Sequence, residues 1–232
     1  IIMTQRDTFI STLFEHAKKD KDIILISVDM GAPSLDVWRK ELPDQFIAAG
    51  ISGQNAVNVA AGLSNTGKKV YVYFMASWVA RCFEQFRYSC AMAKNPITIL
   101  GNGIALGYAP AGPAHEPNED IGYMRTLCDI EIITPANNHF TKALVPLTLE
   151  NPKLRYLRLE RKFASEVEDE YQNINETTLN TSMQLIKGGL SENLNDKPKI
   201  TLLSSGYMLG RAIGAWRNLV GEEYEISVYD LF

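Results

Sequence analysis

The segment GISGQNAVNVAAGLSNTGKKVYVYF, residues 50–74, shows most clearly how this chain folds. Residues 54–64 are rich in small side chains and predict a helix that packs closely against its neighbours. Residues 69–74 form a short apolar run with β-branched and aromatic side chains, which predicts a strand. A helix followed at once by a strand is one step of the alternation that builds parallel sheets.

The same alternation continues on both sides of this segment. Phe9, Ile10 and Leu13 repeat with the helical period over residues 4–19, and Thr4 can cap that helix. Further helices are expected at residues 79–93, 120–127 and 138–150, and strands at residues 22–28, 46–49, 97–101, 130–134 and 155–159. This rhythm predicts an α/β fold over residues 1–163, a doubly wound, mostly parallel sheet with helices on both faces.

A second, partial α/β domain is expected after this sheet. Residues 164–180 are acidic and polar and predict a linker. Residues 181–232 then contain two predicted strands, at 200–204 and 225–229, around a helix at 208–220. Because so small a unit buries little apolar surface, we expect this second domain to be cut short.

Composition and charge narrow the classes of function. The 232 residues carry a net charge of -4 without a block of lysine and arginine, which argues against nucleic acid or an anionic membrane as partner. No apolar run reaches the roughly 20 residues of a membrane helix, and the first residues lack the apolar region of a signal peptide. Cys82, Cys90 and Cys128 have no metal-ligand spacing. We therefore expect a cytoplasmic protein with reduced, buried thiols and no metal site of its own.

Chemistry is expected at the carboxyl ends of the strands, where open parallel sheets bind ligands. A carboxylate (Asp29), an aromatic side chain (Trp78) and an imidazole (His115) follow three of the predicted strands. Each has an ordinary structural explanation: a helix cap, a core residue and a surface residue. Together they favour a small-molecule site.

Several segments, taken in order, resemble the transketolase family. They are ISVDMGAPS (26–34), GISGQNAVNVAAGLS (50–64), RCFEQFR (81–87), GYAPAGPAHEPNEDIGYMR (107–125), IITPAN (132–137) and YLRLERK (156–162). The match covers residues 4–163 and resembles the pyrimidine-binding domain of that family. The residues after 180 resemble the start of the family's third domain.

The resemblance implies a cofactor and a partner. Thiamine diphosphate (ThDP), with a divalent metal, Mg or Ca, would bind between two domains from different chains. The family's GDG…N motif, which grips the diphosphate and metal, is absent from this sequence. An N-terminal-half, diphosphate-binding transketolase subunit is therefore implied, in an α2β2 assembly.

The resemblance also implies roles for individual residues. Trp78 aligns with the aromatic residue that stacks on the aminopyrimidine ring, although a shifted gap places Ser77 there. The other expected cofactor contacts are Asp29, Gln54 and Phe74. The expected substrate contacts are His115 and Asn102 for the donor's hydroxyl groups, and Arg161, Ser34 and Arg6 for its phosphate.

One position departs from the family. Its members use a glutamate that bonds N1′ of the pyrimidine and promotes formation of the reactive ylid, and this position is Gly53 here. The flanking Ser52 and Gln54 are polar but are not strong acids. Three explanations stay open: a slow enzyme, a subunit that binds without turnover, or a deliberately introduced Glu→Gly change.

The first functional hypothesis is therefore one subunit of a ThDP-dependent transferase that moves a two-carbon ketol unit from a ketose phosphate to an aldose. The altered loop at Asn102, Pro110 and Ala111 suggests a specialised sugar pathway, such as surface-polysaccharide precursors. The alternative is a catalytically silent subunit that scaffolds or regulates its partner. 1-Deoxyxylulose-5-phosphate synthase and 2-oxoacid dehydrogenase β-subunits share the fold and rank lower.

Overall fold

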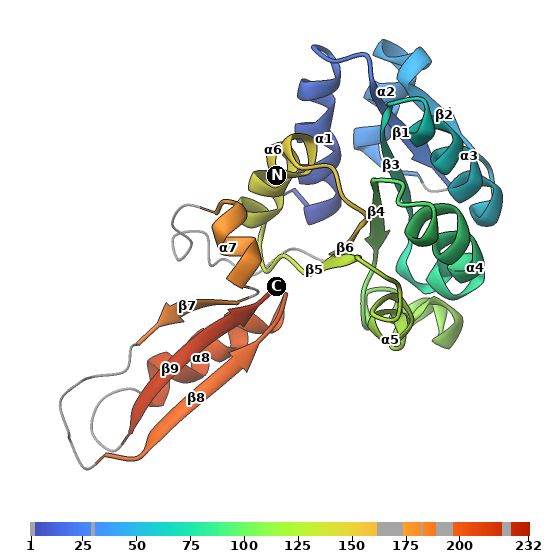
Figure 1. The fold of residues 1–232 in the computed structure, drawn as a ribbon. Coiled ribbons are helices and arrows are strands. Elements are labelled where there is room, and N and C mark those ends of the chain that lie inside the picture. Colours follow the sequence, from blue (N-terminus) through green and yellow to red (C-terminus); the bar gives the residue numbers. More distant parts are fainter. Residues whose placement is uncertain (1–2, 29–30, 162–173, 182, 189–196, 220–223) are drawn as a thin grey trace.

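A large parallel sheet forms the centre of the N-terminal part of the molecule (Figure 1). The computed structural model describes residues 3–28, 31–161, 174–181, 183–188, 197–219 and 224–232. The strands of the large sheet are β1 (Ile23–Ser27), β2 (Phe46–Ala48), β3 (Lys69–Met75), β4 (Ile97–Asn102), β5 (Glu131–Ile133) and β6 (Arg155–Leu159). They lie in the order β2-β1-β3-β4-β6-β5, and every pair is parallel. The predicted doubly wound α/β sheet is confirmed.

Helices cover both faces of this sheet (Figure 1). One face packs against α1 (Gln5–Ala17), α2 (Pro33–Glu41) and α6 (Asn138–Glu150). The other packs against α3 (Gly53–Asn65), α5 (Asp120–Met124) and a helical run made of Ala76–Cys82, α4 (Phe83–Gln85) and Phe86–Met92. Alternate residues of β1 and β3 enter the two cores, so these central strands are almost entirely apolar.

The local predictions can be compared with these elements. Thr4 caps α1, because its hydroxyl accepts a hydrogen bond from the backbone N–H of Asp7. The helix expected at residues 79–93 is a succession of 3-10, α and π geometry. Helix α2 was not predicted, although Pro33 stands in its first turn, where proline is favoured.

The C-terminal residues form a smaller sheet of β7 (Met183–Lys187), β8 (Lys199–Ser204) and β9 (Glu225–Leu231), in the order β7-β9-β8. Strand β7, which was not predicted, pairs antiparallel with β9, and β8 pairs parallel with it. Helix α8 (Met208–Leu219) packs on this sheet. Most of the predicted linker at 164–180 lies outside the described residues, and its end enters the short helix α7 (Glu176–Thr181).

The two sheets share one apolar core. Leu209 and Ile213 of α8 are buried in the same cluster as Phe140 and Leu144 of α6. The rings of Phe140 and Phe232 meet edge to face, with their centroids 5.0 Å apart. None of the described helices is long and apolar enough to cross a membrane.

The strand order sets the position of the site. Because β1 lies between β2 and β3, the connections after β1 and β2 leave toward opposite sides of the sheet. In such folds ligands bind beyond the carboxyl ends of the strands near this reversal. The segments that follow β2, β3, β4 and β6 all meet at this edge.

Candidate active site

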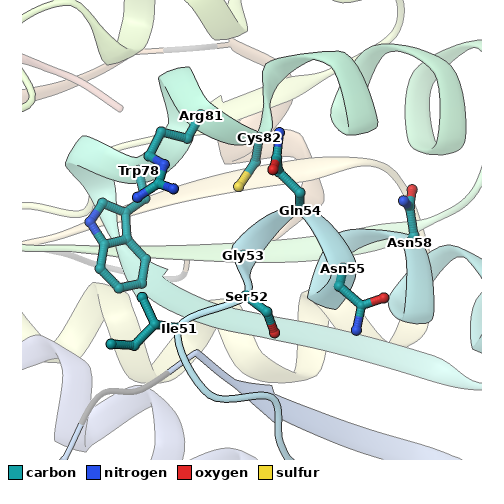
Figure 2. Close-up of a pocket in the computed structure, with 9 residues that line it drawn as sticks. All are labelled: Ile51, Ser52, Gly53, Gln54, Asn55, Asn58, Trp78, Arg81 and Cys82. Atoms are coloured by element: carbon teal, nitrogen blue, oxygen red, sulfur yellow. The ribbon is translucent and has the colours of Figure 1, made fainter.

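A cavity of about 400 Å³ opens at the N-terminus of α3 (Figure 2). Its lining residues are Ile51, Ser52, Gly53, Gln54, Asn55, Asn58, Trp78, Arg81 and Cys82. The first six come from the start of α3 and the turn before it, and the last three from the helical run after β3. The cavity therefore joins two segments that the sequence analysis assigned to the cofactor side.

The space beside Gly53 is filled by a sulfur atom. A Cβ at residue 53 would lie 2.9 Å from Sγ of Cys82 and 4.0 Å from Cγ1 of Val28. Figure 2 shows the Cys82 side chain pointing from its helical run toward Gly53. Gly53 is not among the glycines with positive φ, so its backbone accepts a side chain. The obstacle to a glutamate here is the thiol, not the backbone.

The thiol of Cys82 does not supply the acid that the family resemblance leads us to expect at position 53. Burial raises the pKa of Cys82 to about 11, and the nearby Arg81 only partly opposes this shift. The thiol is therefore protonated near neutral pH. The Ser52 hydroxyl donates its proton to the carbonyl oxygen of Ala49. All the lining residues are described, and they include no carboxylic acid.

Trp78 and Phe74 differ in what they can contact. Trp78 is partly buried and presents its indole to the cavity (Figure 2). Ser77, the alternative from the shifted gap, does not line the cavity, and its buried Oγ has no hydrogen-bond partner. Phe74 is fully buried and stacks on Phe86, with centroids 5.9 Å apart. In this conformation the Phe74 side chain packs in the core, and its expected contact with the cofactor stays a prediction.

Arg6 and Ser34, two of the predicted phosphate contacts, meet at one carboxylate. The guanidinium of Arg6 donates to Asp7 at 2.8 Å, and the Ser34 hydroxyl donates to Asp7 at 2.7 Å. Burial alone would raise the pKa of Asp7, but hydrogen bonds from Arg6, Thr4 and Ser34 outweigh it and lower that pKa. The cluster therefore holds a fixed negative charge beside a cation. The sequence predicted a helix cap at Thr4 but not that Asp7 would join Arg6 to Ser34.

The other three predicted substrate residues meet around Tyr108. The Nδ2 of Asn102 donates to the Tyr108 hydroxyl at 2.9 Å. The guanidinium carbon of Arg161 lies 4.3 Å from the centroid of the Tyr108 ring, and the His115 ring centroid lies 6.3 Å from it. Sequence reasoning did not single out Tyr108, because a tyrosine in a loop rich in glycine and proline carries no spacing signal.

Two of the predicted cofactor contacts, Asp29 and Gln54, remain to be described. Asp29 lies outside the described residues. Gln54 is exposed at the mouth of the cavity.

Asp120, the aspartate of the EDI segment, faces the interior. Its carboxylate accepts hydrogen bonds from the Tyr156 hydroxyl at 2.7 Å and from Arg158 at 2.8 Å. This part of the motif therefore holds β6 in place.

The fold and the cavity define a doubly wound α/β domain with a cavity at the carboxyl edge of its sheet. The chain belongs to the transketolase family, because residues 3–165 match the family described as "Transketolase, pyrimidine binding domain".

Curated relatives include components of split enzymes. The chain is 33% identical over 228 residues to one of the subunits of the apulose-4-phosphate transketolase of Phocaeicola vulgatus, covering 97% of this chain and 70% of that protein. It is 27% identical over 219 residues to 6-deoxy-6-sulfo-D-fructose transketolase subunit SqwH of Clostridium sp. (strain MSTE9), covering 94% of this chain and 64% of that protein. This chain thus spans about two thirds of the length of these relatives.

A solved structure has the same fold. "Split gene transketolase, inactive beta4 tetramer" superposes with a TM-score of 0.81 at 25% identity, over 98% of this chain and 71% of that one. The chain is therefore similar in fold to a split-gene transketolase chain.

Proposed function

We propose that this chain is the pyrimidine-binding subunit of a ThDP-dependent enzyme that transfers a two-carbon ketol unit between sugar phosphates. The observation that carries the proposal is the cavity at the start of α3, where Trp78 and Gln54 meet position 53. The Arg6 cluster lies at the start of α1, where the neighbouring Gln5 bonds to the segments after β5 and β6, and Arg161 follows β6. A cofactor face and a phosphate-binding face thus share one edge, as a transferase requires.

The residues present fit an aminopyrimidine ring except for the acid. The Trp78 indole offers a flat aromatic surface, the exposed Ile51 an apolar one, and Gln54 a hydrogen-bonding group. When bound, ThDP supplies a carbon nucleophile that attacks a carbonyl. Its diphosphate and a divalent metal, Mg or Ca, would be held by the partner subunit. Among the described residues, no group of three or more His, Cys, Asp or Glu side chains is placed to hold a metal.

The roles of this chain's residues follow from their charges. Arg6 and Arg161 are cations that would hold the phosphate of the donor sugar, with Ser34 as a further donor. His115 and Asn102 would orient the sugar's hydroxyl groups. Trp78 would keep water from one face of the cofactor. Asp29 would lie near the thiazolium ring.

The proposed partner is an N-terminal-half subunit, in an α2β2 assembly, in the cytoplasm. Two of the relatives are named as subunits of a transketolase, and the structural neighbour is titled a split-gene protein. The names of the two curated relatives also contain unusual sugars, apulose 4-phosphate and 6-deoxy-6-sulfo-D-fructose. They support a specialised sugar as the donor.

A catalytically silent subunit is the second candidate, and one observation favours it. The position of the family's glutamate is a glycine, and the neighbouring thiol occupies the space beside it. General acid–base catalysis typically contributes about 10² to 10⁴-fold. A site without its acid would bind ThDP and the partner yet turn over slowly or not at all.

Calorimetry followed by an activity assay tests both candidates. The chain is mixed with its N-terminal-half subunit, ThDP is titrated, and ketol transfer is then measured on the same sample. We expect Trp78→Ala to weaken ThDP binding by about tenfold, because it removes an aromatic stacking surface. Trp216→Phe is the matched control, because Trp216 lies on α8 and donates to Ile226. Binding without turnover supports the silent subunit, and absence of binding refutes both candidates.

A further inference from the structure

Tyr108 contacts three of the five residues expected to bind the donor sugar phosphate, Asn102, Arg161 and His115. Its hydroxyl accepts a hydrogen bond from Asn102, its ring face carries the Arg161 guanidinium, and its ring edge approaches His115. Arg161 is held from a second side, because its Nη1 donates to the carbonyl oxygen of Gly107 at 3.3 Å. The loop thus fixes the arginine through two consecutive residues.

A glycine makes room for the tyrosine ring. Gly103 has φ +77, and a Cβ there would lie 2.0 Å from Cε2 of Tyr108. Any other residue at this position would push the ring away and strain the backbone. The ring therefore lies directly against the chain that leaves β4. The position of the Tyr108 ring thus depends on the absence of a side chain at Gly103.

Two side-chain atoms of residues around Tyr108 have no hydrogen-bond partner. Asn102 is fully buried, and because its Nδ2 is used by Tyr108, only its Oδ1 is left without a partner. Nδ1 of His115 also lacks a hydrogen-bond partner. Buried polar atoms of this kind are normally satisfied, so they indicate a ligand or water with complementary groups. Oδ1 of Asn102 is an amide oxygen and can accept a hydrogen bond from a hydroxyl group.

We propose that Tyr108 is a specificity-determining residue that orients the donor-binding side chains of this site. Its ring positions Arg161 to bind an anionic group, a phosphate or sulfonate. Its hydroxyl turns Asn102 so that the amide presents an acceptor to a sugar hydroxyl. The inference rests on the proposed function and adds the residue that selects a hydroxylated, anionic donor. Tyr108 acts through Arg161 and Asn102, and it is therefore a positioning residue.

Two substitutions separate the two effects. Tyr108→Phe keeps the ring under Arg161 and removes the hydrogen bond to Asn102. Tyr108→Leu removes both. Tyr224→Phe is the control, because Tyr224 is exposed beside β9 on the smaller sheet. Arg161→Gln marks the loss of the proposed phosphate contact itself.

The test measures the binding of inorganic phosphate and of fructose 6-phosphate to the full chain by NMR titration. For phosphate, we expect Tyr108→Leu to weaken binding about three- to tenfold and Tyr108→Phe to leave it within about twofold, because a cation–π contact has an energy of this order. For fructose 6-phosphate, we expect both variants to weaken binding, since both release Asn102. The side-chain amide signal of Asn102 should shift in both.

The outcomes distinguish the inference from the function on which it rests. If Arg161→Gln abolishes phosphate binding while Tyr108→Leu does not weaken it, the role of Tyr108 is overturned and the proposed site stands. If Arg161→Gln binds phosphate like the unchanged chain, or the unchanged chain binds neither probe, the phosphate site is wrong and the inference falls with it. If Tyr108→Leu does not fold, Tyr108→Phe decides: equal loss of both probes, or of neither, overturns the proposal.

Discussion

The Sγ of Cys82 lies 2.9 Å from the point that a Cβ on residue 53 would occupy. Real Cβ atoms essentially never come so close to another heavy atom, so any side chain at residue 53 must displace the thiol. Cys82 is buried in the wall of the cavity, where its thiol fills the space beside residue 53. The identities of residues 53 and 82 are therefore coupled, and restoring an acid depends on both.

The first prediction concerns the missing acid. Gly53→Glu alone should restore little ketol transfer, because the thiol deflects the carboxylate. Gly53→Glu combined with Cys82→Ala should raise the rate by about 10² to 10⁴-fold, the usual contribution of acid–base catalysis. The rate is measured with the assembled complex, and Gly53→Gln with Cys82→Ala serves as the matched neutral control. Equal rates for the Glu and Gln double variants would mean that the site has diverged beyond this acid.

The second prediction concerns stability at the same pair. Alanine is better than glycine inside a helix by about 0.5–1 kcal/mol, and Gly53 is the first residue of α3. Gly53→Ala should therefore stabilise the Cys82→Ala background but stabilise the unchanged chain less, or destabilise it. A double-mutant cycle in urea should give a coupling free energy of about 0.5–1 kcal/mol. Additive effects would show that the thiol rotates away without cost.

The fold could be predicted from the sequence because its strands have a strong, regular signal. Strands such as Ile23–Ser27 and Lys69–Met75 are apolar on both faces, which only a sheet covered on both sides explains. Helix α2 was missed because Pro33 and Ser34 were interpreted as turn residues. Strand β7 was missed because two of its five residues are exposed, and its pairing with β9 is a long-range contact.

The candidate site was predicted less completely, for a physical reason. Motif positions identify which residues face the sheet edge, and the structure does bring Gln54 and Trp78 to one cavity. Cys82 and Tyr108 influence the site through contacts with other segments of the chain, which no local period encodes.

The prediction of buried thiols holds for Cys82 and Cys90 but is wrong for Cys128, which is exposed.

The third prediction concerns Asp120. Its carboxylate is 2% exposed and accepts hydrogen bonds from Tyr156 and Arg158. Asp120→Ala should lower the free energy of unfolding by about 3–5 kcal/mol, because it leaves a largely buried arginine without its partner. Asp36→Ala is the control: the Asp36 side chain is 74% exposed and pairs with Arg39, so the loss should be about 0–1 kcal/mol. Similar losses in the two variants would refute a structural role for the EDI carboxylate.

The last prediction concerns the thiols and pH. Burial raises the pKa of Cys82 to about 11 and that of Cys90 to about 12, from an ordinary value of 9.0. Since the folded state favours the protonated thiols, their contribution to stability is complete below pH 9 and is lost as pH rises from 9 toward 11. Cys82→Ala should therefore flatten the fall in stability over this range, measured by urea unfolding, relative to Cys128→Ala.

Labelling by a thiol reagent at pH 8 gives an independent check of the same difference. Cys128 should react rapidly, and Cys82 and Cys90 only as fast as the chain opens, since the thiolate is the nucleophile and both thiols are buried. Rapid labelling of Cys82 in the native chain would show that the sulfur is not held against Gly53. In that case Gly53→Glu alone should be as active as the variant that also carries Cys82→Ala, because the space beside residue 53 would already be accessible.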